Sequence, residues 1–302
     1  MTQAWRPLIH KSSDLITPHA KTREGFITLA LEKNNQANPY IEEAKHLKVL
    51  ANEQKSPYDL WEIEAIRTAL VAAMGVSEKA ATHMDKNVLP GIFDKFAEKF
   101  LVPAGDAFAE ELVYRFLLTK GDALGGKMRN IGGKLGKRRI NRALLANLKI
   151  AGIEHSTIPK DYDNEERIKC IGWKRQKSQR VLAHDKTLPT TKTNVDLCLI
   201  TSSIEQWEKN IKNSELYVAL GELKSGFDPA GADEHWKTAR TALARLRSDG
   251  PASPMLFFVG AAIEKHMAKE IFEMLENNNL QFAANLTNDK QLTCLCQWLI
   301  NI

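Results

Sequence analysis

The feature that most constrains the fold is the stretch PMLFFVGAAI (254–263), which contains no charged side chain. A strand of this composition has no face suited to water, so it is expected to be buried on both sides of a sheet. The stretches NVDLCLI (194–200) and ELYVALGELK (215–224) are also rich in apolar and β-branched residues and are predicted as two further strands. Because helices must cover both faces of such a sheet, the sequence predicts an α/β fold with a mixed central sheet flanked by helices.

The rest of the chain after residue 103 is predicted to supply the covering helices and one more strand. Helices are expected at 106–121, 140–152, 233–247 and 264–277, and a final apolar strand at 292–300. The glycine-rich basic segment at 121–139 and the polar residues at 155–192 are expected to be irregular.

Residues 1–103 are predicted to form a separate helical domain. Apolar residues recur at three- and four-residue spacing, as in amphipathic helices, at 41–54, 57–75 and 91–101. The sequence VPAG (102–105) then interrupts the pattern and is a suitable domain boundary. We therefore expect residues 104–302 to form a second domain.

Basic residues gather in two blocks of this second domain. The formal net charge of +5 is modest, but 120–149 and 167–192 each carry many lysines and arginines against a single aspartate. Such blocks attract phosphate polymers, although a solvated basic surface is the alternative interpretation. The candidate DNA contacts are Lys127, Arg129, Asn130, Lys134, Arg138 and Arg139 in the first block, and Lys174, Arg175, Lys177 and Arg180 in the second.

Three charged residues of the predicted strands form a candidate catalytic cluster. Asp196 lies inside an apolar strand, where a carboxylate is costly unless it has a partner. Glu222 and Lys224 end the next strand and project to the same side, so both can lie beside Asp196 if the strands pair. Two carboxylates suit Mg²⁺, and Lys224 can stabilise the negative charge that develops in phosphodiester hydrolysis. The alternative is a plain ion pair, because Glu-x-Lys triplets are common by chance.

His235 is the candidate general base. It lies at the start of the helix that is predicted to follow the second strand. An imidazole near a metal-bound water can accept a proton from that water. From its spacing alone, a helix-terminal histidine without a catalytic role is the favoured alternative.

Two segments resemble a known family. The stretches GELKSGFDPAGADEHWKTARTALARLR (221–247) and GDALGGKMRNIGGKLG (121–136) are similar to the AvaI/BsoBI type II restriction endonucleases, which have a PD-(D/E)xK-type site. The likeness covers about the last 200 residues by motif, and the N-terminal part by layout. One departure is Val195, which stands where the PD signature has a proline.

The resemblance implies a homodimer that encircles duplex DNA and cuts it with Mg²⁺ at a target such as CYCGRG, leaving 5′ overhangs. Asp196, Glu222 and the backbone carbonyl of Leu223 would hold the metal. Lys224 would match the catalytic lysine, and His235 would lie close to the scissile phosphate. A restriction role also implies a cognate DNA methyltransferase in the same system. Residues 104–302 would then be the catalytic and DNA-binding domain.

The compartment is predicted from features that the sequence lacks. No apolar run approaches the ~20 residues needed to span a bilayer, and the first residues have no signal-peptide layout. We therefore expect a cytoplasmic protein without a membrane partner. The cysteines offer no second pair for a zinc site, so Cys170, Cys198, Cys294 and Cys296 are predicted as packing residues.

Other functions are compatible with the same residues. A repair, recombination or phage nuclease of the same superfamily would share the core and the metal but would lack a defined cutting site. A non-catalytic DNA-binding protein would keep only the ion pair. An RNA-binding module is disfavoured, since the sequence has no zinc knuckle and no aromatic-rich strand of the kind that stacks on bases.

Overall fold

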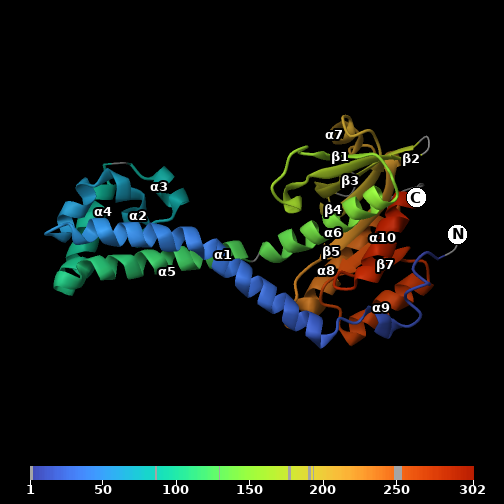
Figure 1. Cartoon of the computed structure of the whole chain (residues 1–302), viewed down its shortest axis with the longest axis horizontal. Helices are drawn as coiled ribbons and strands as arrows, with labels where there is room; N and C mark the ends of the chain where they lie inside the picture. Colours follow the sequence, from blue (N-terminus) through green and yellow to red (C-terminus); the bar gives the residue numbers. More distant parts are fainter. Residues whose placement is uncertain are drawn as a thin grey trace. The chain divides into compact units, whose positions relative to one another are not determined.

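The computed structural model describes residues 3–85, 87–128, 130–175, 178–189, 192, 194–247 and 254–302. The chain divides into two compact units (Figure 1). Met1–Ile27 and Ile131–Ile302 form the first, which we call the sheet unit, and Thr28–Asn130 form the second, the helical unit. This division differs from the expected boundary at residue 103. Trp5 is buried in the core of the sheet unit, whereas Phe116 is buried in the core of the helical unit.

The sheet unit is built on a mixed sheet, as the sequence predicts. Its described strands are β1 (His155–Ile158), β2 (Cys170–Arg175), β3 (Ser178–Thr187), β4 (Asn194–Thr201), β5 (Tyr217–Lys224), β6 (Met255–Gly260) and β7 (Phe282–Asn285). These seven strands lie side by side in chain order. Strands β1 to β5 are antiparallel to their neighbours, whereas β5, β6 and β7 are parallel.

Helices cover both faces of the sheet (Figure 1). The covering helices are α6 (Ile131–Ile150), α8 (Pro229–Arg247), α9 (Lys265–Glu276) and α10 (Asp289–Asn301). In β6, the neighbours Phe257 and Phe258 project to opposite faces. Phe257 packs against Trp298 of α10, and Phe258 packs against Trp236 of α8. The prediction that this apolar strand is buried on both sides is therefore confirmed.

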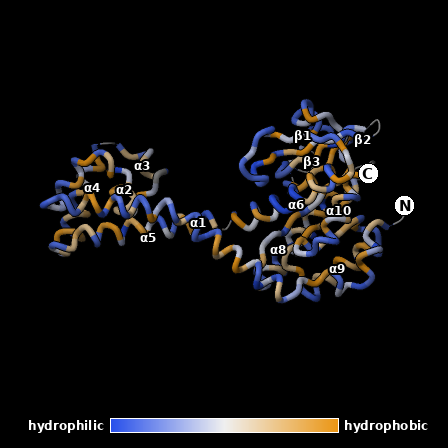
Figure 2. Tube along the Cα trace, in the orientation of Figure 1, coloured by the Kyte–Doolittle hydropathy of each residue, from blue (hydrophilic) through white to orange (hydrophobic). Residues whose placement is uncertain are grey.

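The helical unit consists mainly of α1 (His19–Asn52), α2 (Arg67–Ala73), α3 (Glu78–His83), α4 (Leu89–Phe96) and α5 (Phe108–Met128), with the first residues of α1 in the sheet unit. Hydrophilic and hydrophobic residues are interspersed along these helices (Figure 2). Shorter helical segments are Ser12–Leu15, Pro57–Glu62, Glu64–Ile66, Ala97–Leu101, Val102–Ala107, Glu165–Arg167, Ser214–Leu216 and α7 (Trp207–Asn210). No helix in the described part of the chain is long and apolar enough to cross a bilayer.

The strand predicted at 292–300 is wrong, because these residues lie in α10. Leu292, Leu295 and Leu299 are all buried, and their spacing of three and four residues is helical. Asn288 begins the helix, since its side chain accepts hydrogen bonds from the first backbone amides. The apolar run therefore covers the sheet and is not part of it.

Two segments expected to be irregular are regular. The described residues of 155–192 include β1, β2 and β3, which form an antiparallel ladder: β1 pairs with β2, β2 with β3, and β3 with β4. The described part of the glycine-rich segment 121–139 is largely helical, since α5 continues to Met128 and α6 begins at Ile131. Glycine is unfavourable in an isolated helix. The contacts of α6 with the rest of the sheet unit must therefore outweigh this preference.

Candidate active site

The candidate catalytic residues meet at one edge of the sheet. Leu197 of β4 pairs with Gly221 of β5 in antiparallel register. The next facing positions are therefore Asp196 and Glu222, whose side chains project to the same side. Because β5 ends at Lys224 and β4 begins at Asn194, all three candidate residues lie at the same strand ends.

Lys224 joins the two carboxylates. Its Nζ lies 2.8 Å from Oε2 of Glu222 and 3.3 Å from Oδ2 of Asp196. The same Asp196 oxygen accepts a hydrogen bond of 2.8 Å from the backbone amide of Leu223. The sequence-based expectation that these side chains lie together thus agrees with the geometry, and the Leu223 backbone is held beside both carboxylates.

Burial gives Glu222 an unusual environment. The residue is 3% exposed, and burial, with the nearby charge of Asp196, raises its pKa above the usual range, although Lys224 opposes the shift. Burial alone would lower the pKa of Lys224, but the charges of Asp196 and Glu222 raise it overall. Lys224 is therefore held in its charged form between the two carboxylates.

One oxygen of this cluster has no partner. Glu222 Oε1 is buried and makes no hydrogen bond to any described residue. An unpaired buried carboxylate oxygen is costly, and a cation beside Asp196 and Glu222 would supply the missing interaction. The described residues contain no group of three or more His, Cys, Asp or Glu side chains placed to hold a metal. A cation here would complete its shell with backbone oxygen, water and phosphate, as Mg²⁺ ordinarily does.

The loop that follows Lys224 is tightly enclosed. A Cβ added at Gly136 of α6 would lie 2.2 Å from the Cβ of Ser225, and one added at Gly25 of α1 would lie 2.3 Å from the ring of Phe227. Both glycines therefore allow a close approach that a larger residue would prevent. These two positions were not predicted from the sequence. The glycine spacing in GGKLG (132–136) was the available signal, because residues four apart share one helix face.

His235 lies beside the same loop. It is exposed on the first turns of α8, and its Nε2 would be 3.9 Å from a Cβ at Gly226 and 3.5 Å from one at Gly231. Gly226 is two residues beyond Lys224, so the imidazole is near the strand end that carries the candidate catalytic cluster. Its role as general base stays a prediction.

Part of the first basic block lies on α6, close to the strand end that carries the candidate catalytic residues. Lys134 and Arg138 lie on this helix, on either side of Gly136, which contacts Ser225. Arg139 pairs with Asp289 at 2.9 Å. Of the other candidates in this block, Lys127 and Asn130 belong to the helical unit, where Lys127 Nζ donates to Tyr40 Oη, and Arg129 lies outside the described residues.

The second basic block lies at the other end of the strands. Because β2, β3, β4 and β5 alternate in direction, Lys174, Arg175 and Arg180 are at the strand ends opposite the carboxylates. Arg175 Nη1 and Arg180 Nε donate to the carbonyl oxygens of Ile300 and Ile302, at 3.4 and 3.1 Å. These arginines thus satisfy carbonyls at the end of α10. The structure does not bring them to the catalytic cluster, and Lys177 lies outside the described residues.

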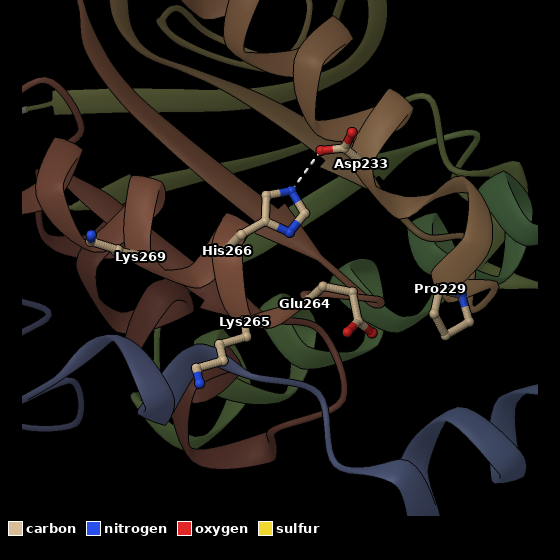
Figure 3. Close-up of a pocket in the computed structure, with 6 residues that line it drawn as sticks. All are labelled: Pro229, Asp233, Glu264, Lys265, His266 and Lys269. Atoms are coloured by element: carbon tan, nitrogen blue, oxygen red, sulfur yellow. Dashed lines mark hydrogen bonds and ion pairs between the residues drawn. The ribbon is translucent and has the colours of Figure 1, made fainter.

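A further hollow lies between the first turns of α8 and α9 (Figure 3). Its volume is about 470 Å³, and its lining residues are Pro229, Asp233, Glu264, Lys265, His266 and Lys269. Asp233 accepts from His266 Nε2 at 2.6 Å and pairs with Lys237 at 2.7 Å, so both of its oxygens are occupied. This hollow is separate from the carboxylates of β4 and β5.

The cysteines are packing residues, as the sequence predicts. Cys170, Cys198 and Cys296 are buried, Cys294 is partly buried, and all are free thiols. Burial raises the pKa of Cys170, Cys198 and Cys296 to about 12. These thiols are therefore neutral and unsuited to metal binding or nucleophilic attack.

Comparison with known proteins assigns the chain to a family. The family model described as "Restriction endonuclease BsobI" matches residues 5–302. The chain is 42% identical over 309 residues to "Type II restriction enzyme AvaI" of Nostoc sp. (strain PCC 7120), covering 97% of this chain and 98% of the relative. It is 43% identical over 308 residues to "Type II restriction enzyme BsoBI" of Geobacillus stearothermophilus, covering 96% and 95%. The chain belongs to the BsobI restriction endonuclease family.

Proposed function

We propose that this protein is a type II restriction endonuclease that hydrolyses phosphodiester bonds in double-stranded DNA at a specific sequence. The observation that carries the proposal is the cluster of Asp196, Glu222 and Lys224, in which a buried Glu222 oxygen lacks a partner among the described residues. Family membership over nearly the whole chain favours sequence-specific cleavage over a repair nuclease or a binding protein without activity.

Mg²⁺ is the proposed cofactor. Asp196, Glu222 and the backbone carbonyl of Leu223 would hold it, because hard oxygen ligands suit this ion. When bound, Mg²⁺ polarises a phosphoryl oxygen and lowers the pKa of coordinated water. The unpartnered Oε1 of Glu222 supports a cation at this position.

The chain's own groups would carry out the remaining steps. The Lys224 ammonium, held by the two carboxylates, would orient the attacking water and stabilise the negative charge that develops on the phosphate. His235, beside the loop after Lys224, would accept a proton from that water. Lys134 and Arg138 on α6 would contact backbone phosphates and help to place the DNA strand.

The target and the assembly are also part of the proposal. A palindromic site is read by a protein with two-fold symmetry, so we propose a homodimer acting at a CYCGRG-like target. The support is the similarity to AvaI and BsoBI over nearly the whole chain. A restriction role places the enzyme with cellular DNA in the cytoplasm, and it requires a cognate methyltransferase that protects the host's own sites. Residues 104–302 would include the catalytic residues of this enzyme.

A plasmid digest tests the function. Purified protein is incubated with plasmid DNA in Mg²⁺ or in EDTA, and the fragment ends are sequenced. Discrete Mg²⁺-dependent fragments that share one end sequence are expected. A Mg²⁺-dependent smear would instead indicate a nuclease without a defined site, and intact DNA that shifts on a gel would indicate binding alone.

A further inference from the structure

We infer that Gly136 is a positioning residue for catalysis: the close contact of α6 with Ser225 holds Lys224 in place beside Asp196 and Glu222. The inference rests on the proposed roles of these three residues. Ser225 directly follows Lys224 in the chain and is only 6% exposed. Contact at Ser225 therefore acts one residue away from the ammonium that joins the carboxylates.

The contact leaves no room for a side chain on α6. A Cβ at Gly136 would lie 2.2 Å from Ser225 Cβ and 2.6 Å from its Oγ. Carbon atoms in van der Waals contact lie about 3.5–4.0 Å apart. Ser225 Cβ is bonded to the backbone, so rotation of the side chain cannot move it away. Either the helix or the strand end must move to admit a methyl group.

The helix is restrained from moving outward. Asn141, five residues further along α6, is buried, and its Oδ1 bonds His184 Nε2 of β3 at 2.7 Å. The Nδ2 of Asn141 also donates to the carbonyl of Glu165 at 2.7 Å. Breaking a buried hydrogen-bond network of this kind is costly.

The loop is restrained on its other side. Phe227 packs against Gly25 of α1 so closely that a Cβ at Gly25 would lie 2.3 Å from the Phe227 ring. The loop from Ser225 to Phe227 therefore has little freedom to absorb a displacement. The Lys224 carbonyl accepts a hydrogen bond of 2.8 Å from Ala261, so a shift of Ser225 strains the end of β5 itself.

Neighbouring glycines of α6 provide matched controls. A Cβ at Gly133 would meet nothing within 4 Å, and one at Gly132 would come no closer than 3.8 Å to the Ser225 carbonyl oxygen. Gly133→Ala and Gly136→Ala are the same chemical change three residues apart on one helix. Helix propensity favours alanine over glycine at both positions. A loss of cleavage rate in Gly136→Ala that is absent in Gly133→Ala therefore comes from the contact with Ser225.

The test compares cleavage rate with DNA affinity. Single-turnover cleavage is measured in Mg²⁺ with enzyme in excess, and the Kd for the same DNA is measured in EDTA. Gly136→Ala is expected to slow cleavage at least about tenfold, with a Kd within about threefold of wild type and a cooperative thermal transition. Gly133→Ala is expected to cleave within about twofold of wild type. Wild-type cleavage by Gly136→Ala would overturn the inference, as would a rate loss matched by an equal loss of DNA affinity.

Changes at Ser225 identify the contact. With Ser225→Gly the clashing Cβ is absent, so adding Gly136→Ala to Ser225→Gly should change the rate less than about twofold. With Ser225→Ala the Cβ remains, and the loss caused by Gly136→Ala should persist. If Gly136→Ala alone does not unfold cooperatively, the comparison of Ser225→Gly with the double variant Ser225→Gly/Gly136→Ala decides. An undiminished loss of cleavage rate in the double variant would refute the contact.

Lys224→Ala, assayed in parallel, separates this inference from the proposed site. If Lys224→Ala cleaves like wild type, the site assignment fails and the positioning role fails with it. If Lys224→Ala is inactive while Gly136→Ala is fully active, only the positioning role fails. An inactive Lys224→Ala together with a slow Gly136→Ala that Ser225→Gly rescues supports both.

Discussion

Lys224 Nζ lies 2.8 Å from Oε2 of Glu222, while Oε1 of the same carboxylate is buried without a partner among the described residues. The two carboxylate oxygens of Glu222 thus have different environments. One balances the lysine charge, and the other remains available to a cation.

Replacing Glu222 with glutamine should nearly abolish cleavage and preserve DNA binding. The change keeps the shape of the side chain but removes the negative charge that a cation requires. We expect the single-turnover rate to fall on the order of 10²–10³-fold. Glu215→Gln, an exposed residue near the start of β5, is the matched control and should cleave like wild type. Equal rates for the two variants would disprove the assignment of Glu222.

Adding Mg²⁺ should raise the thermal stability of the DNA-free protein. A cation that binds only the folded state stabilises it by about 1.4 kcal/mol when its concentration is tenfold above Kd. Differential scanning fluorimetry in Mg²⁺ and in EDTA measures this shift in Tm. The shift should vanish in Asp196→Asn, whose neutral side chain leaves Lys224 in place. A shift that persists in this variant would locate the cation elsewhere.

His235→Ala should slow cleavage without loss of folding. The imidazole is exposed, so its removal leaves the core intact, but it lies beside the loop after Lys224. Loss of a general base typically costs about 10²–10⁴-fold in rate. The exposed His83 of α3 offers a control, since His83→Ala should have no effect on the rate. Full activity of His235→Ala would mean that this histidine only occupies the helix end.

His184 should make stability depend on pH. Burial, aided by the charges of Lys137 and Lys186, lowers its pKa from 6.5 to about 3. Between these values the unfolded chain binds a proton that the folded protein does not. The stability from neutral His184 is therefore fully present above pH 6.5 and falls by about 1.4 kcal/mol per pH unit as pH drops toward 3.

Denaturant unfolding at several pH values checks this slope. His184→Gln keeps a donor for Asn141 but cannot titrate, so its stability should depend less on pH between 6.5 and 3 than that of wild type. His83→Gln, a change at an exposed site, should keep the wild-type slope. If His184→Gln and wild type have parallel pH profiles, His184 is not the titrating group.

The two basic blocks should behave differently when single residues are removed. Lys134 is exposed on α6, so Lys134→Ala should weaken DNA binding and reduce the salt slope of log K by about 0.9. Arg180→Ala should instead remove the hydrogen bond to Ile302, lowering stability by about 1 kcal/mol with an unchanged salt slope. Binding titrations at several salt concentrations, with thermal melts, separate the two effects. A reduced salt slope for Arg180→Ala would place the second block on DNA.

The strands that carry the candidate site were predictable because the sequence signals for them lie within a few residues. Glu222 and Lys224 are two residues apart in a strand, so their common orientation follows from strand geometry. An isolated carboxylate such as Asp196 in an apolar strand indicates a partner. The register that places Asp196 opposite Glu222 required only that consecutive strands pair, which is the commonest arrangement.

The other elements depend on partners distant in sequence. Strands β1 to β3 are stabilised by pairing in series, with β3 next to β4, and their polar residues conceal the alternating pattern of a strand. The apolar stretch that forms α10 is short enough to suit either a strand or a helix, and its place over Phe257 decides the outcome. The glycines of α6 predict a loop locally, although these residues are helical and the approach to Ser225 requires glycine at position 136. The boundary between the units could not be predicted from the sequence either, because Trp5, at the start of the chain, is buried in the core of the sheet unit.

The register of β4 against β5 also bears on safety, since a nuclease is dangerous to the cell that makes it. Side chains alternate along a strand, so a slip of one residue in this pairing would turn Asp196 to the face opposite Glu222 and Lys224. A chain with this misalignment would then have no cleavage activity, and would not be a nuclease that cuts DNA indiscriminately. Under the proposed assignment of these residues, cleavage requires the native alignment of β4 and β5, so a chain that is misaligned there cannot cut DNA.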